Sequence, residues 1–192
     1  MDLYFIRHTS VNVKEGICYG YSDVELSQTF ESEVNILKEK ISISPQMIFY
    51  SSPLKRCILL AERLSITDPI IDTRIIELNF GDWELKDWSL INKSEREKWL
   101  NNFVNFRCPN GESYLDLYKR ATDFFEALVK KKYENVAIIT HGGFIRSILS
   151  YILDIPLKKS FSIQINYGSV SKIKFNQDNS NNTYITVEYI NR

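Results

Sequence analysis

The sequence lacks an excess of charge of either sign, because 24 Lys and Arg residues balance 24 Asp and Glu residues. Proteins that bind nucleic acids or anionic membranes usually carry a basic excess, so we expect neither partner for this chain. A site for an anion must then be built from a few placed cationic side chains rather than from the net charge of the protein.

Cysteine is also scarce. The three cysteines, Cys18, Cys57 and Cys108, are odd in number and widely spaced, which excludes a framework of disulfides and favours a reducing compartment. No run approaches the length of about 18 apolar residues that a membrane span needs. Residues 1–8 also lack the charged and apolar pattern of a signal peptide. We therefore expect a soluble cytoplasmic protein.

Glycine and proline are few, with 7 and 5 residues among 192, and 44% of the residues are hydrophobic. This composition is typical of globular proteins and excludes collagen-like and disordered chains. The length fits a single domain, which we expect to span residues 1–192. The sequence does not indicate an oligomeric state.

Short apolar runs alternate with segments of helical spacing. Residues 3–6 form a continuous apolar run, as expected of a strand buried on both faces. The predicted strands are residues 3–6, 47–50, 69–71, 136–139, 162–166, 169–175 and 184–189, with a polar loop over 176–182. The predicted helices are 27–41, 53–64, 86–106, 113–131 and 144–153, with Ser27 and Ser113 as N-caps and Pro53 in a first turn.

Strands separated by helices predict an α/β fold of three layers, α/β/α, with a mostly parallel central sheet and antiparallel strands at one edge. Ligands bind to such sheets outside the carboxyl ends of the strands. This rule selects three segments, Arg7-His8-Thr9, Ser51-Ser52 and Thr140-His141-Gly142.

Both histidines of the chain, His8 and His141, lie at the carboxyl ends of predicted buried strands. One histidine in such a place is more often structural, but two at the ligand-binding edge indicate a functional site. Arg7 continues the first strand, and Arg56 lies in the first turn after the second. A guanidinium matches phosphate oxygens with two parallel donors, so these side chains and the amides that follow Gly142 would form an oxyanion pocket.

Four pieces of the sequence, taken together, resemble the histidine phosphatase superfamily, which has the phosphoglycerate-mutase-like fold. In the order of the family they are Arg7-His8-Thr9, the Ser-Ser-Pro-Leu-Lys-Arg segment over 51–56, Glu77-Leu78 and Thr140-His141-Gly142-Gly143. The resemblance implies a small-molecule phosphomonoester as substrate, and neither a metal nor another cofactor.

The resemblance also implies a transfer in two steps. The imidazole of His8 attacks phosphorus to give a phosphohistidine, which water then cleaves. Arg7, Arg56 and His141 would hold the phosphoryl oxygens, and Glu77 would protonate the leaving alkoxide. Phosphoryl transfer needs positioning and charge stabilisation above all, so this set of residues suits it.

Within the superfamily, residues 16–27 are similar to the corresponding segment of the α-ribazole phosphatases of cobalamin synthesis, and residues 80–84 are similar to a more widely shared segment. This similarity implies hydrolysis of α-ribazole 5′-phosphate. The residues expected to bind the substrate are Thr9, Tyr19, Gly20, Tyr21 and Gly142.

Other functions stay open at this point. A broad phosphomonoesterase and a phosphoglycerate mutase belong to the same superfamily, although Lys14 stands where the mutases have Asn. A binding module without catalysis is a third alternative, and the intact set of site residues counts against it. The sequence departs from the common pattern of the superfamily at two positions. Leu85 stands where glycine is common, which leaves the shape of its loop open. Thr9 also replaces a common glycine, and threonine there is compatible with the α-ribazole phosphatases.

Two further patterns carry competing interpretations. Cys57 and Arg63 have the spacing of the cysteine phosphatases, but the residues between them are helix formers rather than a phosphate-cradling loop. We therefore expect Cys57 to pack inside a helix. The acidic cluster over 77–87 has no nearby histidine, so it is a poor transition-metal site, and a solvated loop is favoured over Mg²⁺ binding.

The first prediction concerns metals. Since the sequence has no cluster of metal ligands, phosphatase activity should survive exhaustive treatment with EDTA. Hydrolysis of p-nitrophenyl phosphate before and after chelation measures this. Activity that disappears and returns with Mg²⁺ or Zn²⁺ would identify the acidic segment over 77–87 as a metal site.

Overall fold

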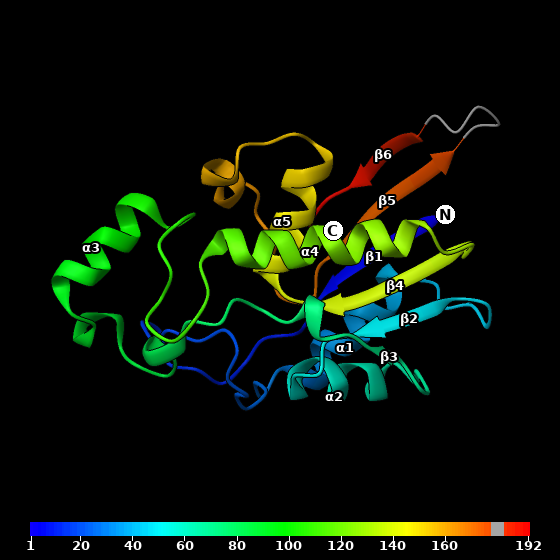
Figure 1. The fold of residues 1–192 in the computed structure, drawn as a ribbon. Coiled ribbons are helices and arrows are strands. Elements are labelled where there is room, and N and C mark those ends of the chain that lie inside the picture. The colour runs from blue at the N-terminus through cyan, green and yellow to red at the C-terminus, as the bar shows by residue number, and fades with distance from the viewer. Residues whose placement is uncertain (178–182) are drawn as a thin grey trace.

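The structure is a computed structural model that describes residues 1–177 and 183–192. A sheet in the order β3-β2-β4-β1-β5-β6 forms its middle layer (Figure 1). The strands are β1 (Asp2–Arg7), β2 (Ile48–Ser51), β3 (Ile70–Ile71), β4 (Asn135–Thr140), β5 (Val170–Gln177) and β6 (Thr183–Tyr189). Strands β1 to β4 are parallel, and β5 and β6 add an antiparallel edge, as predicted.

Helices cover both faces of this sheet (Figure 1). One face carries α4 (Tyr114–Val129) and α5 (Gly142–Ile152), and the other carries α1 (Phe30–Lys40) and α2 (Lys55–Arg63). In β4, Val136 and Ile138 pack toward the first pair of helices, whereas Ala137 and Ile139 pack toward the second. All four side chains are fully buried, which explains why the apolar run of β4 is continuous. The three-layer α/β/α prediction is confirmed.

The predicted helix over 86–106 is too long. Only Lys93–Asn102 forms a helix (α3) beyond a 3-10 turn at Trp88–Leu90. Asn92 starts α3, because its side chain accepts the backbone N–H groups of the next turn. The aromatic residues of this region pack on each other, as Trp88 before α3 and Trp99 within it do with ring centroids 5.2 Å apart. The helix lies beyond the carboxyl ends of the parallel strands (Figure 1).

The predicted strand over 162–166 is wrong. A 3-10 helix occupies Leu157–Ser162, and the residues after it pair with no strand in the described chain. Their carbonyl groups bond to arginine side chains instead, Ile163 to Arg146 Nε at 3.0 Å and Ile165 to Arg7 Nη1 at 2.6 Å. The alternating isoleucines suggested a strand because both pack on the hydrophobic core.

The ends of the other helices differ from prediction by one turn or less. Helix α1 has Thr29 rather than Ser27 at its N-cap, α2 begins two residues after Pro53, and α5 begins two residues before Phe144. Ser113 caps α4 as predicted and forms a capping box with Asp116. Of the predicted loop over 176–182, residues 178–182 lie outside the described residues.

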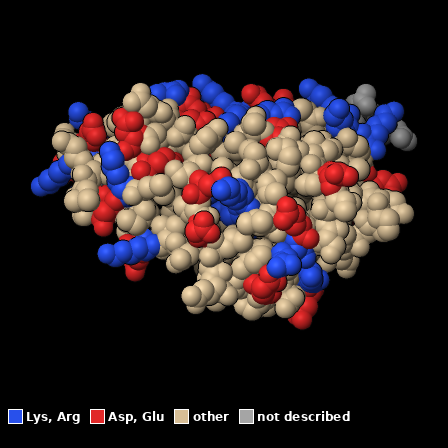
Figure 2. Space-filling model, turned by 90° about the horizontal axis from the view of Figure 1, so that it is seen from below, with Lys and Arg blue, Asp and Glu red and all other residues tan. Residues whose placement is uncertain are grey.

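The surface of the protein mixes charges of both signs. Figure 2 shows Lys and Arg side chains interspersed with Asp and Glu side chains on the face that carries α1 and α2. Arg63 and Glu31 form one such pair, at 2.8 Å. In the described part of the chain, no helix is both long and apolar enough to cross a membrane.

Candidate active site

Three neighbouring strands, β2, β4 and β1, are parallel and in register, so they end at one edge of the sheet. The residue that directly follows each strand is polar and buried, namely Ser52, His141 and His8. The rings of His8 and His141 meet edge to face, with centroids 5.1 Å apart. The sheet itself thus brings together the two histidines that the sequence singled out.

The surroundings of His8 decide which of its nitrogens carries the hydrogen. Nδ1 lies 2.7 Å from the carbonyl oxygen of Thr9, which can only accept, so Nδ1 is the protonated nitrogen. Nε2 keeps its lone pair and accepts from Arg56 Nε at 3.2 Å. Burial, and then the positive charges of Arg56 and Arg7, hold the pKa of His8 well below its ordinary value. His8 is therefore neutral and Nε2 carries no proton, so its lone pair can act as a nucleophile once the hydrogen of Arg56 Nε turns to a ligand.

His141 is neutral for the same physical reasons. Burial, and then the positive charge of Arg56, hold the pKa of His141 well below its ordinary value. Its Nε2 lies 2.7 Å from Ser52 Oγ, which accepts the N–H of Leu54 and so can donate its own hydrogen to the ring. Nε2 also lies 3.6 Å from Cys57 Sγ, whereas Nδ1 is buried and has no partner among the described residues. With the ring hydrogen on Nδ1, His141 has one N–H for a ligand.

Arg56 is 1% exposed and is held by carbonyl groups rather than by carboxylates. Its Nη1 donates to the carbonyl oxygen of Ser22 at 2.9 Å and its Nη2 to that of Gly20 at 2.5 Å. Arg7 donates to Ile165 and lies under the ring of Tyr167, with Cζ 3.7 Å from the ring centroid. No carboxylate of the described residues forms an ion pair with either arginine. Their charges are thus available to an anion.

Glu77 faces the same pocket from the segment between β3 and α3. Its Oε2 accepts the N–H of Gly143 at 3.0 Å, and its Oε1 accepts the N–H of Leu78 at 3.0 Å. A Cβ atom at Gly143 would lie 2.2 Å from Oε1, so a side chain there would displace the carboxylate. The glycine is what allows the first turn of α5 to approach Glu77.

One pocket of about 330 Å³ joins these groups to an aromatic chamber. Its polar lining includes Arg7, His8, Arg56, Glu77 and Arg146. Its aromatic lining includes Tyr19, Phe80, Trp88, Trp99, Phe103 and Phe161. We call the guanidinium groups of Arg7 and Arg56 the clamp. A charged clamp beside an aromatic chamber suits a molecule with a small anionic group on a flat or apolar body.

The structure therefore brings Arg7, His8, Arg56, Glu77 and Tyr19 to one pocket, with His141 against His8. The other expected substrate-binding residues do not line it. The carbonyl groups of Thr9 and Gly20 hold His8 and Arg56, Tyr21 is 46% exposed, and Gly142 starts α5.

Three residues of the site were missed from the sequence. Ser52 lay within a segment that the strand-end rule selected, so that rule could have found it. Tyr167 and Arg146 gave no comparable signal, because both reach the pocket beside a segment that resembled a strand.

The competing patterns have structural explanations. Cys57 is buried in α2, and burial raises the pKa of its thiol to about 12, which rules out a reactive thiolate. The carboxylate of Glu84 accepts the backbone N–H groups of Gly20, Tyr21, Ser22 and Phe80, so it organises the loop that holds Arg56. No group of three or more His, Cys, Asp and Glu side chains among the described residues is placed to hold a metal ion.

Comparisons with known proteins agree with this geometry. The family model described as the histidine phosphatase superfamily (branch 1) matches residues 3–186. An adenosylcobalamin/alpha-ribazole phosphatase of Escherichia coli is 26% identical over 188 residues, covering 92% of this chain and 91% of its own. A protein of Hydrogenobacter thermophilus described as putative phosphoserine phosphatase 2 is 28% identical over 190 residues, covering 95% of this chain and 94% of its own. The crystal structure of the alpha-ribazole phosphatase from Shigella flexneri has the same fold, with a TM-score of 0.88 at 21% identity, covering 100% and 96%.

The second prediction uses the two histidines as reporters. In the folded protein neither ring should gain a proton between about pH 7 and pH 6, whereas both should titrate near 6.5 in urea. Because only the unfolded chain then takes up these protons, the free energy of unfolding should fall as the pH drops below about 6.5. Proton NMR of the two Cε1–H resonances measures the titration. A folded-state midpoint at or above the urea value for either ring would contradict the prediction.

Proposed function

Since the chain belongs to the histidine phosphatase superfamily, we propose that it is a metal-independent phosphomonoesterase that works through a phosphohistidine at His8. One observation carries this proposal. The unprotonated Nε2 of His8 lies 3.2 Å from Arg56 Nε, inside a pocket where no described carboxylate pairs with the arginines. The guanidinium groups would hold a dianionic phosphate so that its phosphorus atom faces Nε2 of His8.

In the first step Nε2 of His8 forms a bond to phosphorus while the ester P–O bond breaks. Glu77, in its protonated form, gives its proton to the leaving oxygen, so the product is a neutral alcohol. Arg7, Arg56 and the Nδ1–H of His141 stabilise the equatorial oxygens, and each charge-assisted contact contributes about 1.5–3 kcal/mol. His8 donates its Nδ1–H to Thr9 throughout, which disperses the positive charge of the phosphorylated ring.

In the second step water attacks the phosphohistidine. Glu77, now ionised, accepts one proton from that water as the new O–P bond forms and the P–N bond breaks. Inorganic phosphate leaves, His8 returns to its neutral form and Glu77 is protonated again. The two steps use one carboxylate first as acid and then as base, as microscopic reversibility requires.

For the substrate we propose α-ribazole 5′-phosphate. Within the aromatic chamber, Phe80, Trp88 and Trp99 offer stacking surfaces for a benzimidazole base beyond the charged clamp. The similarity to alpha-ribazole phosphatases, at 26% identity to the Escherichia coli protein, supports the same substrate. A phosphate ester with a carboxylate, such as phosphoserine, is the second candidate. It is favoured by Arg146, a further guanidinium that lines the pocket.

The third prediction is the outcome of a substrate panel. We expect kcat/KM to be highest for α-ribazole 5′-phosphate when it is compared with phosphoserine, sugar phosphates, nucleotides and phosphoglycerates. Release of inorganic phosphate is measured, with His8→Ala as the inactive control. A preference for phosphoserine would select the second candidate, and phosphate binding without turnover by the wild-type protein would select the binding module. Isomerised phosphoglycerate in place of released phosphate would identify a mutase.

The fourth prediction separates the proton donor from the phosphate clamp. Glu77→Gln keeps the size of the side chain but removes its transferable proton. It should slow single-turnover cleavage of an alkyl phosphate by about 10²–10⁴-fold, and that of p-nitrophenyl phosphate far less, because a phenolate leaves without a proton. Arg56→Lys should slow both esters, since they share the phosphoryl group. Equal losses on both esters for Glu77→Gln would show that another group, Glu84 or Asp82, is the acid.

A further inference from the structure

The segment that carries Glu77 has little regular structure of its own. It lies between two 3-10 turns, Thr73–Ile75 and Gly81–Trp83. Regular secondary structure therefore does not set the position of this segment, and the bonds from Leu78 and Gly143 hold only the carboxylate end of the Glu77 side chain. A general acid must stay within about 2.6–3.2 Å of the atom that it protonates, so other contacts have to hold this segment in place.

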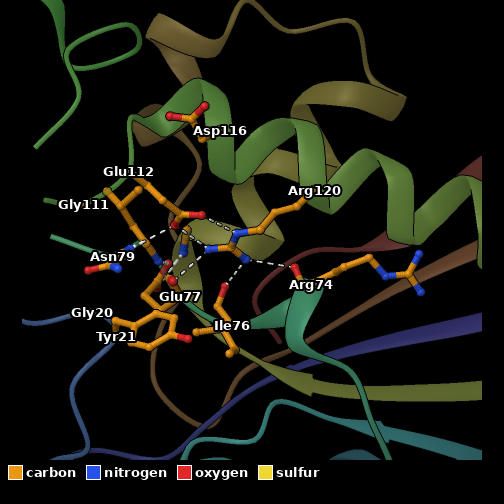
Figure 3. Close-up of polar contacts among 12 residues, drawn as sticks. Gly20, Tyr21, Arg74, Ile76, Glu77, Asn79, Gly111, Glu112, Asp116 and Arg120 are labelled. Carbon is orange, nitrogen blue, oxygen red and sulfur yellow. Dashed lines mark hydrogen bonds and ion pairs between the residues drawn. The ribbon is translucent and has the colours of Figure 1, made fainter. Parts of the chain in front are cut away.

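One of these contacts comes from the end of β4, where Thr140 Oγ1 donates to the carbonyl oxygen of Ile75 at 2.6 Å, and three come from one side chain of α4. Arg120 donates through Nη1 to the carbonyl oxygens of Arg74 and Ile76, at 2.9 and 2.5 Å, and through Nη2 to that of Glu77, at 2.8 Å (Figure 3). Its remaining hydrogens, one on Nε and one on Nη2, meet the carboxylate of Glu112, each at 2.9 Å. A guanidinium has five N–H donors, and here all five have acceptors.

Glu112 reaches the same segment from the other side. Its carboxylate oxygen Oε2 accepts the N–H of Asn79 at 3.0 Å, and its own N–H donates to the carbonyl oxygen of Asn79 at 2.8 Å. The ion pair with Arg120 is mostly shielded from solvent, with side chains 18% and 22% exposed. The pair therefore forms hydrogen bonds to the backbone between residues 74 and 79, on both sides of Glu77.

We propose that Arg120 and Glu112 form a positioning pair that holds Glu77 at the reacting oxygen. This inference rests on the function proposed above, in which Glu77 is the proton donor and acceptor. In the part of the chain that the structure describes, the pair forms no hydrogen bond to His8, Arg7 or Arg56, which are held by the strand ends and by other carbonyl groups. Loss of the pair should therefore impair proton transfer and leave the phosphate clamp in place.

Arg120→Lys is the sharpest test of this pair. Lysine keeps the positive charge but lacks the planar fork, so it cannot serve three carbonyl groups and a carboxylate together. A displacement of about 1 Å in a reacting group can cost about 10²-fold in rate. We expect Arg120→Lys to slow single-turnover cleavage of the alkyl phosphate by about that factor, and that of p-nitrophenyl phosphate much less. Glu112→Gln should change the two rates in the same pattern.

A matched control is available on the same segment. Arg74 forms an ion pair with Asp72 at 2.6 Å, but its side chain bonds to no carbonyl group near Glu77. Arg74→Lys should leave the ratio of alkyl to aryl rates unchanged. Circular dichroism and thermal unfolding establish that each variant is folded. If Arg120→Lys does not fold, Glu112→Gln, which keeps the shape of the side chain, decides.

A double mutant separates this inference from the function on which it rests. If the pair acts through Glu77, Arg120→Lys should add no further alkyl-ester loss in the Glu77→Gln background. Additive losses, or equal losses on both esters for folded Arg120→Lys, would overturn the positioning role. If Glu77→Gln by itself slows cleavage of the two esters equally, the proposed role of Glu77 as the acid is overturned instead.

Discussion

The withdrawal of His8 from water is the condition on which the rest of the site depends. Burial and two neighbouring guanidinium groups keep the imidazole neutral, so its Nε2 lone pair is available at a position where an anion is attracted. A carboxylate beside Arg56 or Arg7 would weaken both effects. Neutral carbonyl groups hold these arginines instead, and those carbonyls come from loops rather than from the sheet.

The loop that supplies two of these carbonyls is itself held by unusual means. Glu84 gathers four backbone N–H groups, and Leu85 adopts a φ of 61°, in the left-handed region that favours glycine. Such a conformation costs a non-glycine residue about 1–3 kcal/mol. The N–H of Leu85 donates to the carbonyl oxygen of Cys18 at 2.7 Å, and Cys18 donates back to Lys86 at 2.8 Å. These bonds tie the two loops together and offset the strain.

The mostly parallel sheet with its antiparallel edge, the two helical layers and the placing of His8 and His141 at one edge of the sheet were predictable from the sequence. Buried parallel strands leave continuous apolar runs, and the residue after each run must lie at the ligand-binding edge. The strand predicted over 162–166 failed because isoleucines at alternate positions also occur where a loop packs on the core. Tyr167 and Arg146 could not be predicted for the same reason. Their places follow from bonds between arginines and loop carbonyls, which leave no periodic pattern.

The reacting groups of the pocket and its aromatic chamber are therefore held by different parts of the structure. The nucleophile and its clamp stand on strand ends and on α2, which the sheet fixes relative to one another. The aromatic chamber is built from the segments around Trp88 and Trp99, which pack on each other and on Trp83, and from Phe161, which packs on Phe103 and on Tyr114 of α4. Substitutions in the chamber can therefore change the alcohol that is accepted without moving His8. Glu77 lies between these two regions. The sheet reaches its segment at Ile75, whose carbonyl oxygen accepts from the hydroxyl of Thr140 at 2.6 Å, and Arg120 binds the carbonyl oxygens of Ile76 and Glu77 beyond that point. The ion pair thus supplies the contacts that the sheet does not make to the backbone of the proposed acid.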